Sequence, residues 1–569
     1  MFSSLPRTSQ EFMQLPWADI APFYQELAGR RLNASNVKQF LLDWTALTQL
    51  WYEAYQRLYV GITVDTTDAV AERRYHAFLD EIYPAVQEAE QRLKVKLLAS
   101  GLEPPGFEIP LRIMQTETSL FRQENLPLLA EELKLAEEYE KIVGAQTVEW
   151  EGEELTLLQL QPFYQDPDRE RRERAWRLAA QRQLADREAI NDIWVRAMKV
   201  RRQIAANADL PDFRAYMWRK RLRFDYTPED CYRFHQAIEE VVVPAASRLY
   251  EKRLRRLGVK SLRPWDLEVD PFNRPPLIPF KTIPELEEKT SFIFHQVDPD
   301  LGEYFEIMRR ENLLDLDNRK GKAPGGYCTE FLAIRRPFIF TNAVGVHDDV
   351  QTLLHEGGHA FHVFEASRLP YYQYFQVPYE FSEVASMGME LLASPYLTAD
   401  HGGFYNPAEA ARARIDNLER SLLFWAYMAV VDGFQHWVYL HPDEASDPAS
   451  CDAQWAELWR RFMPGVDWSG LEQEMITGWQ RKGHIHTDPF YYVEYGLALL
   501  GAVQVWNNAL KDQRAAVAAY RKALSLGYSV SLPQLFATAG ARFAMDAGAL
   551  AKAVDLMLQA IDELESQQA

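Results

Sequence analysis

Cysteine is scarce in this chain of 569 residues, which contains only Cys231, Cys328 and Cys451. An odd number of scattered cysteines does not form a disulfide framework, which is typical of small proteins in oxidising compartments. The three are also too far apart in sequence to indicate a second metal site. The scarcity of cysteine favours a reducing, cytoplasmic location.

Long apolar runs are also missing. The strongest run, residues 422–431, stops at Asp432 after ten residues, whereas a membrane-spanning helix needs about 18 or more. The first residues of the chain lack a basic segment followed by an apolar stretch, so we expect no signal peptide. We therefore expect a buried helix at 422–431 and no membrane partner.

Basic side chains are too few for a protein that binds nucleic acid. The chain has 62 Lys and Arg against 82 Asp and Glu, which gives a net charge of −20. Nucleic-acid binding requires a basic surface, so this balance argues against it. The apolar fraction of 47% and the charged fraction of 25% are those of ordinary soluble proteins.

The sequence does contain two histidines at the spacing of metal ligands, because residues 355–359 read His-Glu-Gly-Gly-His. Side chains at i and i+4 lie on one helix face, so His355 and His359 can bind one ion. A catalytic zinc ion keeps three protein ligands and an open position. Glu356, roughly 100° further around the helix, would flank the metal and serve as the base that acts on water.

The surrounding residues support a helix at this motif. Asp348 and Asp349 can cap its start, where the helix dipole favours negative charge. Gly357 and Gly358 each cost roughly 1 kcal/mol relative to alanine inside a helix. Two glycines here predict that another element, or a substrate backbone, comes very close.

The third ligand is expected to be a carboxylate, and the residues alone do not choose it. The candidates are Glu383, Glu365, Glu380 and Glu390. Three of them, Glu380, Glu383 and Glu390, fall near one helical face, so periodicity leaves the choice open.

A resemblance to a known family narrows this choice. Residues 381–392, which begin Phe-Ser-Glu-Val-Ala-Ser, follow the histidine motif and resemble the M3 family of zinc oligopeptidases. The resemblance implies that Glu383 is the third ligand of one Zn²⁺ ion. It also implies a mainly α fold, a large two-lobed helical metallopeptidase with a deep central channel and a small β element beside the zinc helix.

Residues 479–498 extend the resemblance, because they resemble the histidine and tyrosine segment that faces the metal in this family. The resemblance implies one histidine and one or two tyrosine hydroxyls that bond the scissile carbonyl and its oxyanion. His484 is the preferred histidine and His486 the alternative. The tyrosine candidates, in order of preference, are Tyr492, Tyr491 and Tyr495.

Two β elements are expected. Residues 148–157 have the pattern of a hairpin with a short turn. Residues 338–340 form a β-prone run before the zinc helix, within the part that resembles the M3 family. The resemblance implies an edge strand there that pairs antiparallel with the substrate backbone, a mode of binding that accepts many sequences.

Long helices are expected over about 168–207 and 228–257. We place the boundary between an N-terminal helical lobe, residues 1–204, and a catalytic zinc peptidase domain, residues 205–569, near residue 205. Both lobes are expected to surround one channel.

The predicted function is that of a zinc-dependent endopeptidase that hydrolyses internal bonds of short oligopeptides. One alternative is a metallocarboxypeptidase of the related helical M32 type, which needs Arg or Lys to hold the C-terminal carboxylate. The other is a non-catalytic peptide-binding protein of the same fold. The sequence indicates neither the oligomeric state nor the preferred peptide length and sequence.

Overall fold

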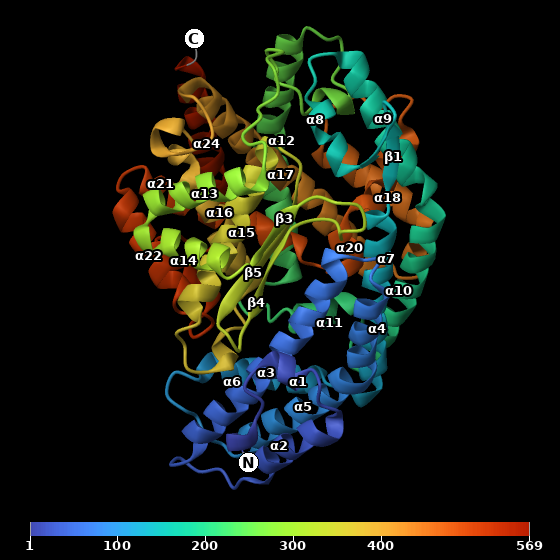
Figure 1. Cartoon of the computed structure of the whole chain (residues 1–569). Coiled ribbons are helices and arrows are strands. Elements are labelled where there is room, and N and C mark those ends of the chain that lie inside the picture. Colours follow the sequence, from blue (N-terminus) through green and yellow to red (C-terminus); the bar gives the residue numbers. More distant parts are fainter. Residues whose placement is uncertain (1, 568–569) are drawn as a thin grey trace.

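The computed structural model describes residues 2–567 and confirms a mainly α protein (Figure 1). The first helices of the chain are α1 (Ser9–Phe12), α2 (Trp17–Gly29), α3 (Val37–Val64), α4 (Ala69–Ala77), α5 (Tyr83–Ala99), α6 (Glu108–Leu120), α7 (Leu126–Gly144), α8 (Gln161–Tyr164), α9 (Arg169–Ala185) and α10 (Arg187–Asn207). The later helices are α11 (Phe213–Lys220), α12 (Pro228–Leu257), α13 (Ile283–Val297), α14 (Pro299–Arg310), α15 (His347–Ala366), α16 (Tyr379–Ala393), α17 (Pro407–Leu440), α18 (Pro448–Phe462), α19 (Glu472–Ile476), α20 (Gly483–Thr487), α21 (Tyr492–Ala509), α22 (Gln513–Leu524), α23 (Leu532–Thr538) and α24 (Ala547–Ser566).

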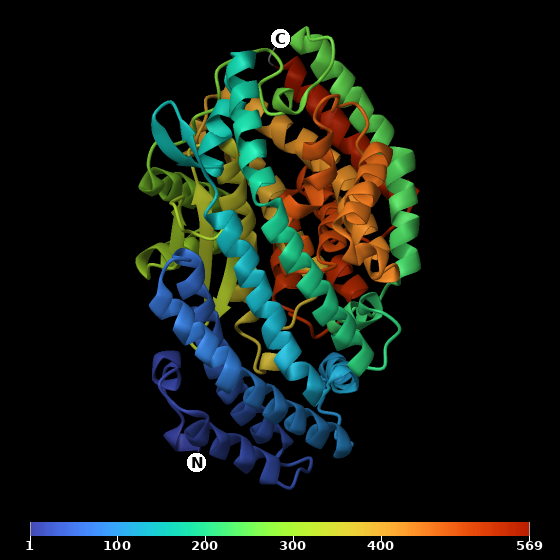
Figure 2. The ribbon, with the colours of Figure 1, turned by 90° about the vertical axis from the view of Figure 1, so that its right-hand side faces the viewer.

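Two large apolar clusters form the interior. One contains side chains between Phe12 and Met114, together with Tyr374, and it lies in the end of the molecule that holds the N-terminus (Figure 2). The other runs from Leu120 to Leu564 and contains most of the later helices. The predicted boundary at residue 205 falls inside helix α10, and it stays a prediction.

Two long helices were expected, and one of them is interrupted. The expected helix over 228–257 is confirmed as α12, which starts with a capping box at Thr227 and ends at Gly258 in the left-handed conformation. The expected continuous helix over 168–207 is wrong, because the chain breaks between α9 and α10 at Asp186. The carboxylate of Asp186 accepts bonds from Gln146 and Arg182 there, so local side-chain bonds accompany the break.

The strands form a hairpin and a three-stranded sheet. The expected hairpin is confirmed as β1 (Thr147–Trp150) paired with β2 (Glu153–Thr156). The sheet contains β3 (Leu314–Asp317), β4 (Tyr327–Phe331) and β5 (Arg336–Ala343), in the order β3-β5-β4. Strand β5 is parallel to β3 and antiparallel to β4.

This order corrects one expectation. Residues 338–340 lie in β5, the middle strand, so the expected edge strand at this run is wrong. The physical reason is burial, since the side chains of residues 337–341 are all buried, as in a strand with neighbours on both sides. The edge beside the histidine motif is instead formed by β4, where three of five residues are half-buried.

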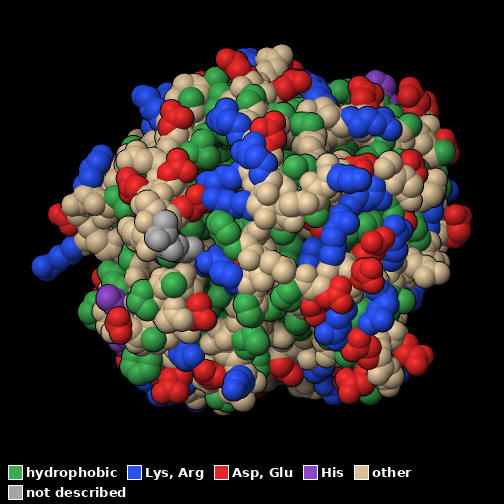
Figure 3. Space-filling model, turned by 90° about the horizontal axis from the view of Figure 1, so that it is seen from above, with side chains coloured by type: hydrophobic (Ala, Val, Ile, Leu, Met, Phe, Trp, Pro, Cys, Tyr) green, Lys and Arg blue, Asp and Glu red, His purple; other side chains and the backbone are tan. Residues whose placement is uncertain are grey.

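The apolar run 422–431 lies inside α17, where most of its side chains are buried. No helix within residues 2–567 is both long enough and apolar enough to cross a membrane. On the face that holds the C-terminus, acidic and basic side chains are intermixed (Figure 3).

Candidate active site

Helix α15 carries the histidine motif, and its start is capped as the sequence predicts. One carboxylate oxygen of Asp349 accepts bonds from the backbone N–H groups of Val344, Gly345 and Val346, at 2.9, 2.7 and 2.9 Å. The bond to Val346 is that of a carboxylate at the third helical position to the N-cap backbone, and the other two bonds hold the segment before the helix against its first turn. Asp348 instead pairs with Arg420.

The two glycines of the motif allow other elements to approach, as predicted. A Cβ atom on Gly358 would lie 2.4 Å from the carbonyl oxygen of Ala385 in α16. A Cβ atom on Gly357 would lie 2.4 Å from the ring of Phe294 in α13. The close approach of α16 brings Glu383 opposite the two histidines.

The three expected metal ligands meet at one point. The Nε2 atoms of His355 and His359 lie 3.2 and 3.4 Å from the same oxygen, Oε2 of Glu383. One ligand atom from each of the three residues lies within 4.8 Å of the others. Two imidazoles and a carboxylate facing one point form the donor set of a catalytic zinc site, so these residues fit the ion.

Each of the three candidate ligands also has a hydrogen-bond partner outside the group. Nδ1 of His355 lies 2.8 Å from Oε1 of Glu390, and Nδ1 of His359 lies 3.2 Å from the hydroxyl of Ser382. The hydroxyl of Ser386 donates to Oε2 of Glu383 at 2.7 Å. Such partners fix ring orientation, and when Nδ1 carries the proton the Nε2 lone pair is free for a metal.

The other carboxylates considered as the third ligand have different partners. Glu390 binds the far side of His355, Glu380 accepts a bond from the hydroxyl of Tyr226, and Glu365 pairs with Arg521. Among the four candidates, Glu383 alone faces both Nε2 atoms.

Glu356 lies beside the ligands at the surface of a cavity. The residue is only 5% exposed, and within the described residues its Oε2 atom has no hydrogen-bond partner. Burial raises the pKa of this carboxyl above its usual value, although both histidines oppose the rise. A buried carboxylate oxygen without a bond is suited to accept a proton from a water molecule.

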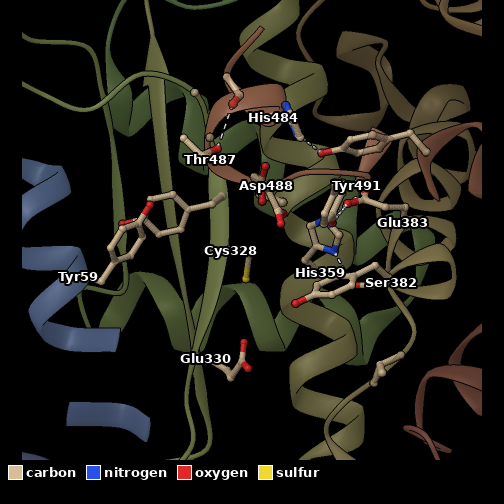
Figure 4. Close-up of a pocket in the computed structure, with 18 of the residues that line it drawn as sticks. Tyr59, Cys328, Glu330, His359, Ser382, Glu383, His484, Thr487, Asp488 and Tyr491 are labelled. Carbon is tan, nitrogen blue, oxygen red and sulfur yellow. Dashed lines mark hydrogen bonds and ion pairs between the residues drawn. The ribbon is translucent and has the colours of Figure 1, made fainter. Parts of the chain in front are cut away.

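The cavity has a volume of about 790 Å³ and contains Glu356 and all three candidate ligands in its wall. Strand β4 forms one side, with the side chains of Cys328 and Glu330 facing the cavity (Figure 4). A volume of this size is typical of sites that enclose a small molecule or a short peptide segment.

His484 lines this cavity and His486 does not. Nε2 of His484 lies 3.1 Å from the hydroxyl of Tyr495. His486 is stacked on Tyr139, with ring centroids 4.3 Å apart, and is buried away from the cavity. Burial, and then the ammonium of Lys482, hold the pKa of His484 well below its usual value, so its imidazole is neutral.

The three candidate tyrosines differ in position. Tyr491 and Tyr495 line the cavity, and the hydroxyl of Tyr491 donates to Oε1 of Glu383. Tyr492 is 3% exposed and packs against Phe424 and Tyr427, outside the cavity wall. This geometry favours Tyr495 and Tyr491 over Tyr492, the tyrosine that the sequence placed first.

A second group of ligand-type residues lies between α12 and α17, where Cys231 comes close to Asp432 and His436. Asp432 already accepts a bond from His235 at 2.8 Å, and a guanidinium nitrogen of Arg214 lies 3.4 Å from Nδ1 of His436. A donor at Nδ1 favours the tautomer with the proton on Nε2, which cannot bind a metal. This group is therefore a buried polar network.

Comparison with known proteins shows the family and the fold of this chain. A sequence model of peptidase family M3 matches residues 163–555. The solved structure of PZ peptidase A with inhibitor 2 shares 28% sequence identity and a TM-score of 0.90, and the match covers 99% of both chains. A structure from Bacillus anthracis str. Ames that carries the name oligoendopeptidase F shares 25% identity and a TM-score of 0.87, over 97% of this chain and 98% of that one.

The curated oligopeptidase PepF of Bacillus subtilis (strain 168) is 24% identical over 255 residues. This match covers 43% of the present chain and 36% of the relative, so the matched part spans about a third of that protein. Because the family match covers more than half of the sequence, the chain belongs to peptidase family M3.

Proposed function

We propose that this chain is a zinc-dependent endopeptidase that hydrolyses internal peptide bonds of short oligopeptides. The observation that carries the proposal is the meeting of His355, His359 and Glu383 at one point, with Glu356 beside them in the cavity wall. Membership of a peptidase family, and the oligopeptidase names of its relatives, support it.

His355, His359 and Glu383 would hold one Zn²⁺ ion. When bound, the ion would supply Lewis acidity, which would lower the pKa of a water molecule toward about 7 and polarise a carbonyl. Glu356 takes a proton from the attacking water and passes it to the nitrogen of the departing amine. Its free Oε2 atom and the absence of a competing ion pair among the described residues leave it available for this transfer.

His484 and Tyr495 are proposed to stabilise the negative charge that develops on the scissile carbonyl oxygen. They are hydrogen-bonded to each other at 3.1 Å and face the same cavity as Glu356. Fixed donors of this kind act where charge develops in the transition state. Tyr491, which donates to Glu383, is proposed to orient that ligand.

Strand β4 is proposed to bind the substrate backbone. It is an edge strand, and Cys328 and Glu330 on it line the cavity. A peptide that pairs antiparallel with β4 would run with its N-terminal part near Glu330 and its C-terminal part toward Tyr327. Main-chain bonds of this kind suit a peptidase that accepts many sequences.

We further propose that the protein works in the cytoplasm on peptides. Within the described residues, Cys231, Cys328 and Cys451 are free thiols, as a reducing compartment favours.

The test compares two variants on an internally quenched peptide blocked at both ends. Glu356→Gln should keep one zinc per chain and lose nearly all hydrolysis, whereas His359→Ala should lose zinc by elemental analysis. Glu457→Gln, at an exposed position, is the matched control.

Each alternative function predicts a different result in this test. A carboxypeptidase would cut peptides with a free C-terminus and leave the blocked peptide intact. A binding protein would bind zinc and the peptide, and would leave the peptide uncleaved. Brisk cleavage by Glu356→Gln would remove that residue from the role of base.

A further inference from the structure

Glu330 places a carboxylate without a cationic partner in the wall of the catalytic cavity. It belongs to strand β4, and it lines the cavity together with Gly326 and Cys328. Within residues 2–567 its carboxylate accepts one bond from another side chain, from the hydroxyl of Tyr52 to Oε1 at 2.8 Å. No Lys, Arg or His side chain of these residues forms an ion pair with it, so Oε2 is available to a cationic group of a ligand.

The other acids of the described lining differ from Glu330. Most have a cationic partner or belong to the proposed metal site: Glu117 with Lys94, Asp488 with Arg221, Glu356 and Glu383. Glu140 is the exception, since it accepts a bond from the hydroxyl of Tyr59 at 3.4 Å and forms no ion pair with a described residue. Of these two unpaired acids, only Glu330 lies on the strand that is proposed to bind the peptide.

Alternate residues along β4 face helix α15 across the cavity. A Cβ atom on Gly326, just before the strand, would lie 3.4 Å from Oε1 of Glu356. Side chains two residues apart on a strand point to the same face, so Cys328 and Glu330 continue this row. Figure 4 shows both side chains on the side of β4 that faces His359. Glu330 therefore faces the same space as the candidate metal site, about 7 Å further along the strand than Cys328.

A peptide that pairs with β4 brings one of its own side chains against Glu330. Residues directly opposite each other in an antiparallel pair lie on the same face, with Cβ atoms about 4.5–5.5 Å apart. The peptide runs opposite to β4, so its residue opposite Glu330 is two positions nearer to the amino end than the residue opposite Cys328. Opposite charges stabilise such a pair and like charges destabilise it, so this position favours lysine or arginine over an acid.

The burial of Glu330 strengthens this preference. Burial raises the pKa of its carboxyl above the usual value, although the bond from Tyr52 opposes the rise. An ammonium or guanidinium group that takes the place of water would stabilise the charged form and would donate a charge-assisted hydrogen bond. A neutral side chain of the same size would do neither.

We propose that Glu330 gives the enzyme a preference for lysine or arginine on the amino side of the scissile bond, at the peptide residue that lies opposite it along the edge of β4. This rests on the proposed endopeptidase function and on the proposed pairing of the peptide with β4. The ligand class is a short peptide with a basic side chain at that position, and Glu330 is the residue that selects it.

The test uses internally quenched peptides that are blocked at both ends and differ at one residue. Arginine is compared with citrulline, which has nearly the same shape without the charge, at each position on the amino side in turn. At one position the zinc-loaded wild type should cleave the arginine peptide with a kcat/KM about fivefold or more above that of the citrulline peptide, between the ranges for an exposed cross-strand pair and for a charge-assisted bond. Mass spectrometry verifies that both peptides are cut at the same bond.

Substitutions of Glu330 separate its charge from its size. In Glu330→Gln the ratio should fall to near one, and Glu330→Asp should retain part of it. Glu330→Lys should reverse the preference, so that a peptide with glutamate at this position is cut faster than one with glutamine. Zinc content and the far-UV circular dichroism spectrum verify that each variant is folded.

Two further acids serve as matched controls. Glu140→Gln removes the other unpaired acid of the described lining, and Glu457→Gln removes an exposed acid outside it. Both should keep the wild-type ratio of arginine to citrulline.

The free amino terminus of a peptide is a second cation that could meet Glu330, and a separate pair of peptides tests it. Peptides that begin with leucine at the selected position, either free or acetylated at the amino end, should be cut alike. A gain from the free terminus without a gain from the arginine side chain would overturn the inference.

Other results would also overturn it while leaving the endopeptidase intact. These are a wild-type ratio near one at every position, a preference that appears only on the carboxyl side of the scissile bond, a ratio unchanged in Glu330→Gln, and a ratio lost in Glu140→Gln. Failure of the wild type to cut any of the peptides would instead overturn the proposed function, and the inference with it.

Discussion

Glu390 lies 2.8 Å from Nδ1 of His355, on the side of the imidazole that faces away from Glu383. The two carboxylates are seven residues apart on α16, so one helix both supplies a candidate ligand and orients another. A carboxylate behind a metal-bound histidine fixes its tautomer and makes it a stronger ligand.

We therefore predict that Glu390→Ala weakens zinc binding by about 10–100-fold while leaving the three ligands in place. Competition with a chromophoric chelator measures this. Glu390→Gln should lose less, because its amide oxygen can still accept the bond from Nδ1, and Glu457→Ala should lose nothing. Unchanged affinity in Glu390→Ala would show that the contact with His355 is not needed for metal binding.

Substitutions of Tyr495 and Tyr492 should have different effects on kcat, because Tyr495 lines the cavity and Tyr492 does not. Tyr495→Phe and His484→Ala are each expected to lower kcat by on the order of 10²–10³, because each removes a proposed donor to the developing oxyanion. The double variant should lose less than the product of the two effects, since the two groups are hydrogen-bonded to each other. KM should change far less than kcat.

Tyr492→Phe is the matched comparison, since its ring is buried outside the cavity wall. Its kcat should stay within a few-fold of wild type. A large loss of kcat in Tyr492→Phe, together with a small loss in Tyr495→Phe, would instead make Tyr492 the oxyanion donor, as the sequence suggests.

The parts of the site that the sequence predicts are those set by nearby residues. His355, Glu356 and His359 occupy one helix, Asp349 caps it, and the glycines mark the approach of another element. The motif, its cap and its glycines can all be recognised from residues that are only a few positions apart in the sequence. The predicted hairpin at 148–157 is confirmed for the same reason.

The parts that it did not predict depend on packing between distant segments. The apolar run 338–340 indicates a strand, but the neighbours of that strand are decided by where β3 and β4 pair. The partner of Nδ1 in His355 is 35 residues away, and the sequence pattern indicates Glu390 only as a rival ligand. Its spacing of seven residues from Glu383, two helical turns, was the available signal.

Gly358 should be intolerant of a side chain. An added Cβ would lie 2.4 Å from a backbone oxygen and 2.6 Å from the Cα atom of Ser386, and backbone cannot move aside cheaply. Gly358→Ala is therefore expected to lower the free energy of unfolding by about 1–3 kcal/mol. It should also weaken zinc binding, because it forces α15 and α16 apart.

Urea unfolding and chelator competition measure the two effects. Gly29→Ala is the control, because an added Cβ there meets nothing within 4 Å, and it should be neutral or stabilising by less than about 1 kcal/mol. Wild-type stability in Gly358→Ala would mean that the two helices can separate without cost.

His486 should make the stability of the protein depend on pH. Its ring is stacked between those of Tyr139 and Trp479, its Nε2 atom has no partner among the described residues, and burial lowers its pKa to about 3. In the unfolded chain the pKa of histidine is about 6.5. Between these values the unfolded state binds a proton that the folded state does not, so stability falls as the pH decreases.

His486 alone should therefore lower the free energy of unfolding by about 2 kcal/mol between pH 6.5 and 4.5. His486→Phe keeps an aromatic ring in the stack and cannot bind a proton, so its loss over this range should be smaller by that amount. Urea unfolding at both pH values measures the difference. His441→Phe, at an exposed position, should keep the wild-type dependence, and equal losses in His486→Phe and wild type would mean that the buried imidazole becomes protonated without unfolding.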